Sequence, residues 1–450
     1  MRTKTRSVRI GAVAAGLVLL LGACGSDDDP EDSGSNETTT TEAAAASATP
    51  ADENGGRTEG DGTLNLGAIL PQSGRLAVLG PPMIQGGQMA IADINEAGGV
   101  LGQDATLSVK DDGGGTDDDL AATATDELIN NDKVDGILGA ASSDTTKAVI
   151  DRVTSSGTVQ CSPSNTGSDL TTWEDEGLYF RTAPPDNLQA QALAKVVSDD
   201  GHQNVAIIAQ NTDYGTGFVE FLDPALTDNG AEVVENITYE ANATSFDAEV
   251  ETIVGSSPDA VVLVAYPEDG GKVVAEMIKQ SAGPADVPLY VTDGMQANAL
   301  YELIDESDPA ITAGVRGTAA SAAPEDGASF FPDAFAAFAP EVESPIYSAQ
   351  SYDCIILMAL AAVKAESDAP FDIAKEMINV SSGETDDAEK CSTFADCIAL
   401  LQDGTDIDYD GASGALDFSE YGEPSAGSYD VFTFGEDGDY AVDEQVVVGS

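Results

Sequence analysis

The segment PLYVTDGMQ, residues 288–296, places an acid where a short apolar run ends. Leu289, Tyr290 and Val291 indicate a buried strand, and Asp293 and Gly294 follow where a turn must begin. Open α/β sheets bind ligands at the carboxyl ends of their strands, so Asp293 could pair with a positive group of a ligand. Such an acid would stand unpaired until the ligand arrives. The alternative is an acid that caps the following helix.

Residue types that could perform catalysis are scarce. Histidine occurs once, as His202 in DDGHQNV, and no Gly-x-Ser-x-Gly motif is present, so a nucleophile with a histidine base would have to use this residue. Gly215 and Gly217 match only part of a dinucleotide fingerprint, because its third glycine is missing, and a loop that opens a helix explains them. We therefore expect no enzyme activity and no cofactor.

A possible metal-binding pattern lies in DIDYDGASGALD, residues 406–417. Asp406, Asp408, Asp410 and Asp417 have the spacing of an EF-hand calcium loop, with Asp in place of Glu at the last ligand position. No entering helix is clear, the following residues are strand-like, and acids are frequent in this chain. We interpret the segment as an acidic hairpin and predict no metal site, with calcium as the alternative.

The charge of the chain is strongly negative. Its 450 residues hold 18 lysines and arginines against 80 aspartates and glutamates, a formal net charge of −62. Such a field repels phosphate backbones, so we expect no nucleic-acid partner. The acids are scattered through the sequence and favour a solvated shell. The hydrophobic share of 42% is sufficient for a sizeable core.

The first 61 residues indicate export and tethering. Four basic residues precede the apolar stretch 10–23, which is too short to span a bilayer but suits a signal peptide over residues 1–23. Leu21-Gly22-Ala23-Cys24 resembles the cleavage box of bacterial lipoproteins, which implies acylation of Cys24 and a lipid anchor on the extracytoplasmic face of the cell membrane. The alternative is an ordinary signal peptide with a chance cysteine. Residues 24–61 lack large apolar side chains and predict a disordered tether.

Four further cysteines allow three pairings. Cys391 and Cys397 are close in sequence, and we expect a disulfide between them in an exported protein. Cys161 lies in a strand-like run and Cys354 in an apolar helix, so we expect two buried thiols there, although the sequence leaves their pairing state open.

The elements that would position Asp293 form two series. Short apolar runs at 64–70, 105–110, 135–140 and 157–161 alternate with helical stretches near 81–97, 117–131 and 143–155. After Pro184-Pro185 a second series has strands at 204–210, 231–239, 259–266 and 287–292. This alternation predicts an α/β fold of two lobes, each a parallel-rich sheet flanked by helices. Residues 315–321 suggest a further strand, and 344–365 a strongly apolar helix.

The segment GAILPQSGRLAVLGPPMIQGGQMAIADINEAGGVLGQDATLSVKDD resembles the opening of periplasmic binding proteins of the leucine-isoleucine-valine type. The resemblance continues through ILGAASSDTTKAV, CSPSNTGSDLT, FRTAPPDNLQAQALA and VAIIAQNTDYGTG and covers residues 62–450. It implies a type I fold with three hinge crossovers near 184, 316 and 425. The first lobe would comprise 62–184 and 317–424, and the second 185–316 and 425–450.

The resemblance also implies a ligand site. Ser143 and Thr166 would hold a substrate carboxylate, with Ser142 and Ser164 along the same edge. Tyr266 and Asp293 would hold an ammonium group, and Tyr214 and Tyr347 would shape the cleft. Leu79 stands where such proteins place an aromatic, and Gly114 and Ser142 stand where they carry a cysteine pair, so the specificity can differ.

The function that the resemblance implies is capture of an amino acid, of branched-chain type or a related amide, by a monomer that delivers it to an ABC permease. The alternative is a sensor lipoprotein that signals to a membrane partner.

Overall fold

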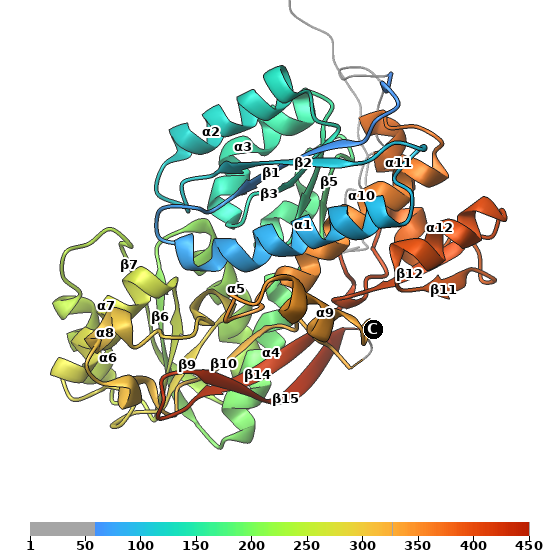
Figure 1. Ribbon diagram of the computed structural model, residues 1–450. Coiled ribbons are helices and arrows are strands. Elements are labelled where there is room, and N and C mark those ends of the chain that lie inside the picture. Colours follow the sequence, from blue (N-terminus) through green and yellow to red (C-terminus); the bar gives the residue numbers. More distant parts are fainter. Residues whose placement is uncertain (1–58, 326, 450) are drawn as a thin grey trace, which may run out of the picture. The chain divides into compact units, whose positions relative to one another are not determined.

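The computed structural model describes residues 59–325 and 327–449 (Figure 1). The predicted signal peptide, Cys24 and most of the predicted tether lie outside the described residues. The described part forms two lobes, each built on its own sheet, with a small third sheet on the first lobe.

The first lobe contains a five-stranded parallel sheet in the order β2-β1-β3-β4-β5. The strands are β1 (Asn65–Leu70), β2 (Thr106–Asp111), β3 (Gly136–Gly139), β4 (Val159–Ser162) and β5 (Tyr179–Arg181). Successive side chains of β1 point to opposite faces. Ile69 packs with α2 (Asp118–Glu127) and α3 (Ser143–Ser155), whereas Leu66 and Ala68 share a cluster with α1 (Gly80–Glu96) and α10 (Ser348–Lys364). Helices therefore cover both faces (Figure 1).

The apolar segment predicted as a helix forms α10, and nearly all of its side chains are buried. It lies beside α1 although the two helices are more than 250 residues apart in sequence (Figure 1). The same part of the chain adds α9 (Phe331–Phe338), α11 (Pro370–Ser382) and α12 (Phe394–Gln402). The small sheet consists of β11 (Glu389–Cys391), β12 (Ile407–Gly411) and β13 (Gly414–Ala415).

The second lobe contains a seven-stranded sheet in the order β15-β14-β10-β9-β8-β6-β7. The first five of these strands along the chain are β6 (Asn204–Gln210), β7 (Glu232–Tyr239), β8 (Ala260–Val264), β9 (Leu289–Val291) and β10 (Arg316–Ala320), all parallel. Antiparallel β14 (Ala426–Phe434) and β15 (Tyr440–Gly449) complete one edge. The helices are α4 (Asp186–Asp199), α5 (Asp213–Asp228), α6 (Asp247–Ser256), α7 (Pro267–Lys279) and α8 (Glu302–Asp305).

Three crossovers join the lobes. The chain leaves the first sheet after β5 and enters α4 through Pro184 and Pro185. It leaves the second sheet after Ala320 and returns to it at Ala426. The predicted crossover near 316 is therefore too early, because it separates β10 from the sheet to which its register with β9 and β14 assigns it.

Two disulfides are present. Cys391–Cys397 links the end of β11 to α12 and confirms the predicted local pair. The prediction of two buried thiols is wrong, because Cys161 of β4 and Cys354 of α10 are also bonded, with their Cα atoms 5.7 Å apart. The helix packs against the sheet and brings together cysteines separated by 193 residues. Their spacing in the sequence carries no signal of this pairing.

The segment with calcium-like spacing forms the β12–β13 hairpin. Lysines contact its acids: Lys364 Nζ lies 3.1 Å from Asp406, and Lys390 Nζ lies 2.9 Å from Asp410. Within residues 59–325 and 327–449, no group of three or more metal-ligating side chains is placed to hold an ion.

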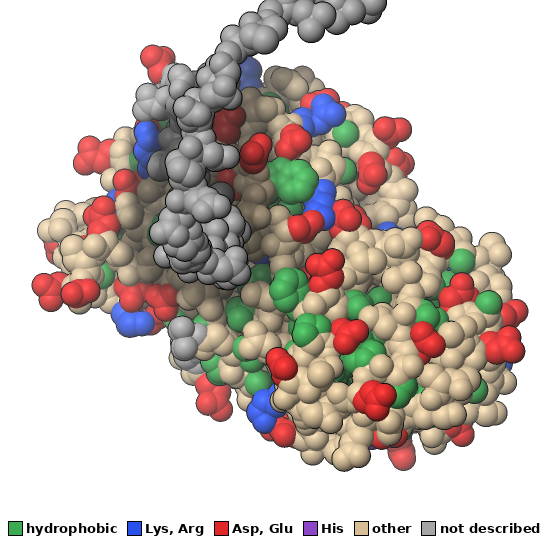
Figure 2. Space-filling model, turned by 180° about the vertical axis from the view of Figure 1, so that it is seen from behind, with side chains coloured by type: hydrophobic (Ala, Val, Ile, Leu, Met, Phe, Trp, Pro, Cys, Tyr) green, Lys and Arg blue, Asp and Glu red, His purple; other side chains and the backbone are tan. Residues whose placement is uncertain are grey.

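Acidic side chains are spread over the face seen in Figure 2, with few basic side chains among them. This distribution agrees with a solvated acidic shell. None of the helices in the described part of the chain is long and apolar enough to cross a membrane.

Candidate ligand-binding site

A cavity lies between the two lobes, among loops at the carboxyl ends of both sheets. It holds about 330 Å³ of space, part of which is open to solvent. Its lining comprises Leu76, Leu79, Met83, Ala141, Ser143, Ser164, Thr166, Tyr214, Tyr266, Asp293, Gly294 and Tyr347.

Eight of the nine predicted ligand-binding residues line this cavity, and Ser142 does not. Ser142 is the N-cap of α3: its Oγ accepts a hydrogen bond from the Thr145 N–H at 3.0 Å and donates to Thr145 Oγ1 at 2.8 Å. Its side chain therefore fixes the start of α3.

The first lobe contributes hydroxyl groups beside a helix N-terminus. Ser143 is the first residue of α3, and its Oγ accepts a hydrogen bond from the Gly167 N–H at 3.1 Å, which leaves its own O–H able to donate. Ser164 Oγ donates to the Ala141 carbonyl at 2.8 Å. Thr166 lies on the same loop and is 2% exposed. Backbone N–H groups in the first turn of a helix lack partners within it and favour an anion.

The second lobe contributes Asp293, which follows β9 and is 4% exposed. One carboxylate oxygen accepts a hydrogen bond from the Tyr214 hydroxyl at 2.8 Å, and the other from the Tyr347 hydroxyl at 2.5 Å. The expectation that this acid stands unpaired is therefore wrong. Tyr214 also stacks on Tyr266, with ring centroids 5.2 Å apart. Tyr214, Tyr266 and Tyr347 line the cavity together with the acid.

Burial dominates the electrostatics of this cluster. It raises the pKa of Asp293, and the hydrogen bonds from Tyr347 and Tyr214 oppose that shift. Burial also raises the pKa values of Tyr214 and Tyr347, and the negative charge of Asp293 adds to the effect. Both tyrosines therefore stay protonated at neutral pH and remain donors.

A second buried acid, Asp186, was not predicted from the sequence. It is the first residue of α4 and is fully buried, and a hydrogen bond with the Thr166 side chain opposes the rise of its pKa. Its backbone N–H donates to the Thr166 carbonyl at 2.7 Å. Burial, followed by the charge of Asp293, raises the pKa of Asp186 to about 8. In the sequence it is indistinguishable from any acid in the first turn of a helix.

Arg75 is a second residue near the cavity that was not predicted from the sequence. It is 9% exposed, its Nη2 donates to the Gly115 carbonyl at 2.7 Å, and its guanidinium lies 5.8 Å from the ring centroid of Tyr266 in the other lobe. This cation–π geometry adds a contact between the lobes. Leu76, Leu79 and Met83, from the segment that follows Arg75, form an apolar wall of the cavity.

The only histidine lies in the second lobe, away from the cavity lining. His202 Nδ1 is 3.8 Å from Asp259, and its ring meets Tyr290 edge to face. It therefore contributes no side chain to the candidate site.

Comparison with known proteins gives a consistent family. Residues 63–395 match the family model described as periplasmic binding protein. The chemotactic signal transduction system substrate-binding protein BasB of Halobacterium salinarum is 24% identical over 372 residues, which cover 81% of this chain and 85% of BasB. The Leu/Ile/Val-binding protein BraC3 of Rhizobium johnstonii is also 24% identical over 372 residues, which cover 82% of this chain and 91% of BraC3.

A solved structure shows the same fold. The branched-chain amino acid transporter substrate binding protein LivJ from Streptococcus pneumoniae, in complex with isoleucine, superimposes with a TM-score of 0.70 at 22% identity. The alignment covers 86% of this chain and all of LivJ. The predicted two-lobed α/β fold is confirmed, and the chain belongs to the periplasmic binding protein family.

Proposed function

We propose that the protein captures an amino acid between its lobes outside the cytoplasm and delivers it to an ABC permease. The observation that carries this proposal is the buried carboxylate of Asp293 in a cavity whose twelve lining residues include no lysine or arginine. Asp186, a second buried acid, is electrostatically coupled to Asp293. A ligand ammonium group would supply a positive charge for the Asp293 carboxylate, which lines the cavity.

The opposite wall of the cavity, in the first lobe, would bind the carboxylate group of the ligand. The start of α3, the Ser143 hydroxyl and Thr166 form an edge suited to an anion without a basic side chain. A zwitterion would thus lie with its ammonium group toward the second lobe and its carboxylate toward the first.

The side chain of the ligand would contact the apolar wall of Leu76, Leu79 and Met83. This wall favours an aliphatic amino acid, in agreement with the relative named as a Leu/Ile/Val-binding protein and with isoleucine in the LivJ structure. A related amide is the alternative ligand.

A thermal-shift screen tests the ligand class. The twenty amino acids, small amides and aromatic acids are each added to the purified protein. An aliphatic amino acid should raise the melting temperature most, since a ligand at 100 times its Kd stabilises the folded state by about 2.7 kcal/mol. Stabilisation by amides or aromatic acids alone would contradict the amino-acid assignment.

A sensor is the second candidate function, because BasB is named as part of a chemotactic signal transduction system. Uptake of the radiolabelled ligand by cells that lack the gene separates the two functions. Transport predicts loss of uptake. A sensor predicts normal uptake with loss of the response to the ligand.

Membrane attachment through acylated Cys24 belongs to the same proposal. It is supported by the cleavage box at residues 21–24 and by the polar segment that follows it. Two or more acyl chains hold a protein stably on a bilayer, whereas a single chain is marginal.

A further inference from the structure

Thr166 lies on a short loop between β4 and the 3-10 turn Ser168–Thr172. Side chains of the first lobe hold its amides: Ser162 Oγ accepts from the N–H groups of Ser164 and Asn165, and Ser143 Oγ accepts from that of Gly167. These bonds provide acceptors for three backbone N–H groups of the loop. Its carbonyl groups need separate partners.

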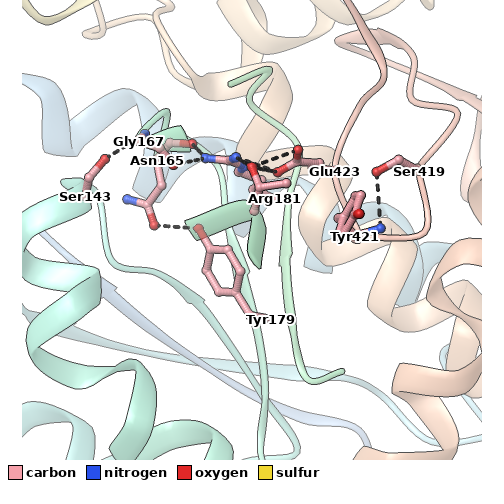
Figure 3. Close-up of polar contacts among 9 residues, drawn as sticks. Ser143, Asn165, Gly167, Tyr179, Arg181, Ser419, Tyr421 and Glu423 are labelled. Atoms are coloured by element: carbon pink, nitrogen blue, oxygen red, sulfur yellow. Dashed lines mark hydrogen bonds and ion pairs between the residues drawn. The ribbon is translucent and has the colours of Figure 1, made fainter. Parts of the chain in front are cut away.

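The Asp186 N–H binds the carbonyl of Thr166, and one guanidinium group binds those of the two flanking residues. Arg181 Nη1 donates to the Gly167 carbonyl at 2.8 Å and to the Asn165 carbonyl at 3.3 Å, so a single nitrogen bridges the two residues that flank Thr166. The Tyr179 hydroxyl donates to Asn165 Oδ1 at 2.9 Å. Figure 3 shows Asn165 and Gly167 on one side of Arg181 and Glu423 on the other.

The remaining donors of Arg181 face Glu423. Arg181 Nε and Nη2 donate to Glu423 Oε2 at 2.8 and 2.5 Å, and Nη2 also donates to Thr171 Oγ1 at 2.8 Å. Thr171 Oγ1 in turn donates to Glu423 at 3.0 Å. All five N–H donors of the guanidinium are thereby used. The fork geometry of arginine allows this, whereas an ammonium group has three donors at one point.

Glu423 lies at the start of the third crossover, three residues before β14. The turn before it docks on β5, because the Arg181 N–H donates to the Gly422 carbonyl at 3.0 Å. Gly422 has a φ of +72°, and a Cβ there would lie 2.7 Å from the Phe180 ring, so the close approach requires glycine. Arg181 itself lies three residues before Pro184, at the first crossover.

The ion pair is almost completely buried. The side chain of Arg181 has no exposed surface and that of Glu423 is 9% exposed. Burial lowers the pKa of Arg181 and the charge of Glu423 raises it, with the net result above the ordinary value. The charge therefore persists, and an unpaired partner would be costly in this setting.

We infer that Arg181 is a positioning residue for ligand binding: it fixes the backbone on both sides of Thr166 and ties that loop, through Glu423, to the third crossover. The ligand contact assigned to Thr166 rests on the proposed function. The placement of the loop by Arg181 does not. This ion pair couples the third crossover to the position of Thr166, whereas the bond from the Asp186 N–H to the Thr166 carbonyl ties the same loop to the first crossover.

The test compares Arg181→Lys and Glu423→Gln with wild type. Arg316→Lys is the matched control, because Arg316 of β10 forms an ion pair with Asp200 in the second lobe, away from the cavity lining. Hydrogen exchange of the peptide 163–172 is measured without ligand. Affinity is measured by calorimetry for the amino acid that stabilises wild type most.

Both test variants should speed exchange in 163–172, with a loss of affinity on the order of tenfold, the scale of one buried hydrogen bond lost. Arg316→Lys should leave both unchanged. Thr171→Val and Thr171→Ser provide milder variants: the valine should reproduce the effect and the serine, which keeps the hydroxyl, should restore it. If Arg181→Lys and Glu423→Gln do not fold, the two Thr171 variants still test whether Arg181 positions the loop.

If the test variants melt at a lower temperature but keep the exchange of 163–172 and the affinity of wild type, Arg181 contributes only to stability and the inference is wrong. If wild type binds no amino acid, the proposed function fails, whereas the exchange of 163–172 still decides whether Arg181 positions the loop.

Discussion

The Tyr347 hydroxyl donates a hydrogen bond to Asp293 Oδ2 at 2.5 Å and so joins the two lobes across the cavity. Tyr347 immediately precedes α10 in the first lobe, and Asp293 follows β9 in the second. Asp293, which we propose binds the ligand, therefore also forms a hydrogen bond between the two lobes. Ligand affinity and lobe closure should therefore depend on the same carboxylate.

Tyr347→Phe should weaken ligand binding by about 10- to 100-fold. The variant removes a hydrogen bond to a charged group, worth about 1.5–3 kcal/mol, and every 1.4 kcal/mol is a factor of ten. The loss should lie in the dissociation rate, because the bond forms only between closed lobes. Stopped-flow dissociation checks this.

The control for this prediction is Tyr290→Phe. Tyr290 donates to Asp200 at 2.6 Å within the second lobe and does not line the cavity. Equal dissociation rates in the two variants would show that the bond across the cavity does not stabilise the closed state.

Asp186 should make stability depend on pH. Burial and then the charge of Asp293 raise its pKa to about 8, well above the value near 3.9 of an unfolded chain. The folded protein keeps a proton that the unfolded chain loses, so this stabilisation is complete below about pH 4 and is lost as the pH rises through about 8.

Asp186→Asn should remove this loss. Between pH 6 and 8 the free energy of unfolding should fall by on the order of 2 kcal/mol more in wild type than in the variant. Urea unfolding at the two pH values measures the difference. Parallel pH profiles would show that Asp186 ionises normally in the folded protein.

The two disulfides should differ in their contribution to stability. Cys161–Cys354 closes a long loop and Cys391–Cys397 a short one, with sequence separations of 193 and 6. In the loop-entropy model the long one contributes about 5 kcal/mol and the short one less than about 3 kcal/mol. Urea unfolding of the two double alanine variants should follow this order, and the reverse order would contradict it.

Local patterns were predictable from the sequence. The predicted ranges 143–155 and 204–210 are the bounds of α3 and β6, because apolar periodicity and flanking turn residues are local signals. Strand β15 was not predicted, since its side chains are mostly exposed and follow no apolar alternation.

Long-range pairings were not predictable. Arg181 and Glu423 are 242 residues apart, and nothing in either neighbourhood indicates the other. The resemblance to a family predicted Asp293 and its tyrosines as site residues. Asp186 could be identified only from the structure, because tertiary packing removes its carboxylate from water.

Cys24→Ala should release the protein from membranes or leave the signal peptide uncleaved. The cleavage box at residues 21–24 motivates this prediction, and acyl chains on Cys24 would supply the attachment. Membrane fractionation with immunodetection is the measurement. A variant that fractionates like wild type would rule out anchoring through this cysteine.

The central claim, that Asp293 holds a ligand ammonium group, is tested most directly by titration calorimetry of wild type and Asp293→Asn. The ligands are L-leucine and 4-methylpentanoate, which has the same carbon chain without the ammonium group. Asp353→Asn is the control, because Asp353 is a buried acid that accepts a hydrogen bond from the Tyr409 hydroxyl at 2.7 Å but does not line the cavity.

Removing one member of a buried charged pair costs about 2–5 kcal/mol, so wild type should prefer leucine by roughly 30-fold or more, and Asp293→Asn should lose most of that preference. Asp353→Asn should keep it. Equal binding of the two ligands by wild type, or an unchanged preference in Asp293→Asn, would contradict the account.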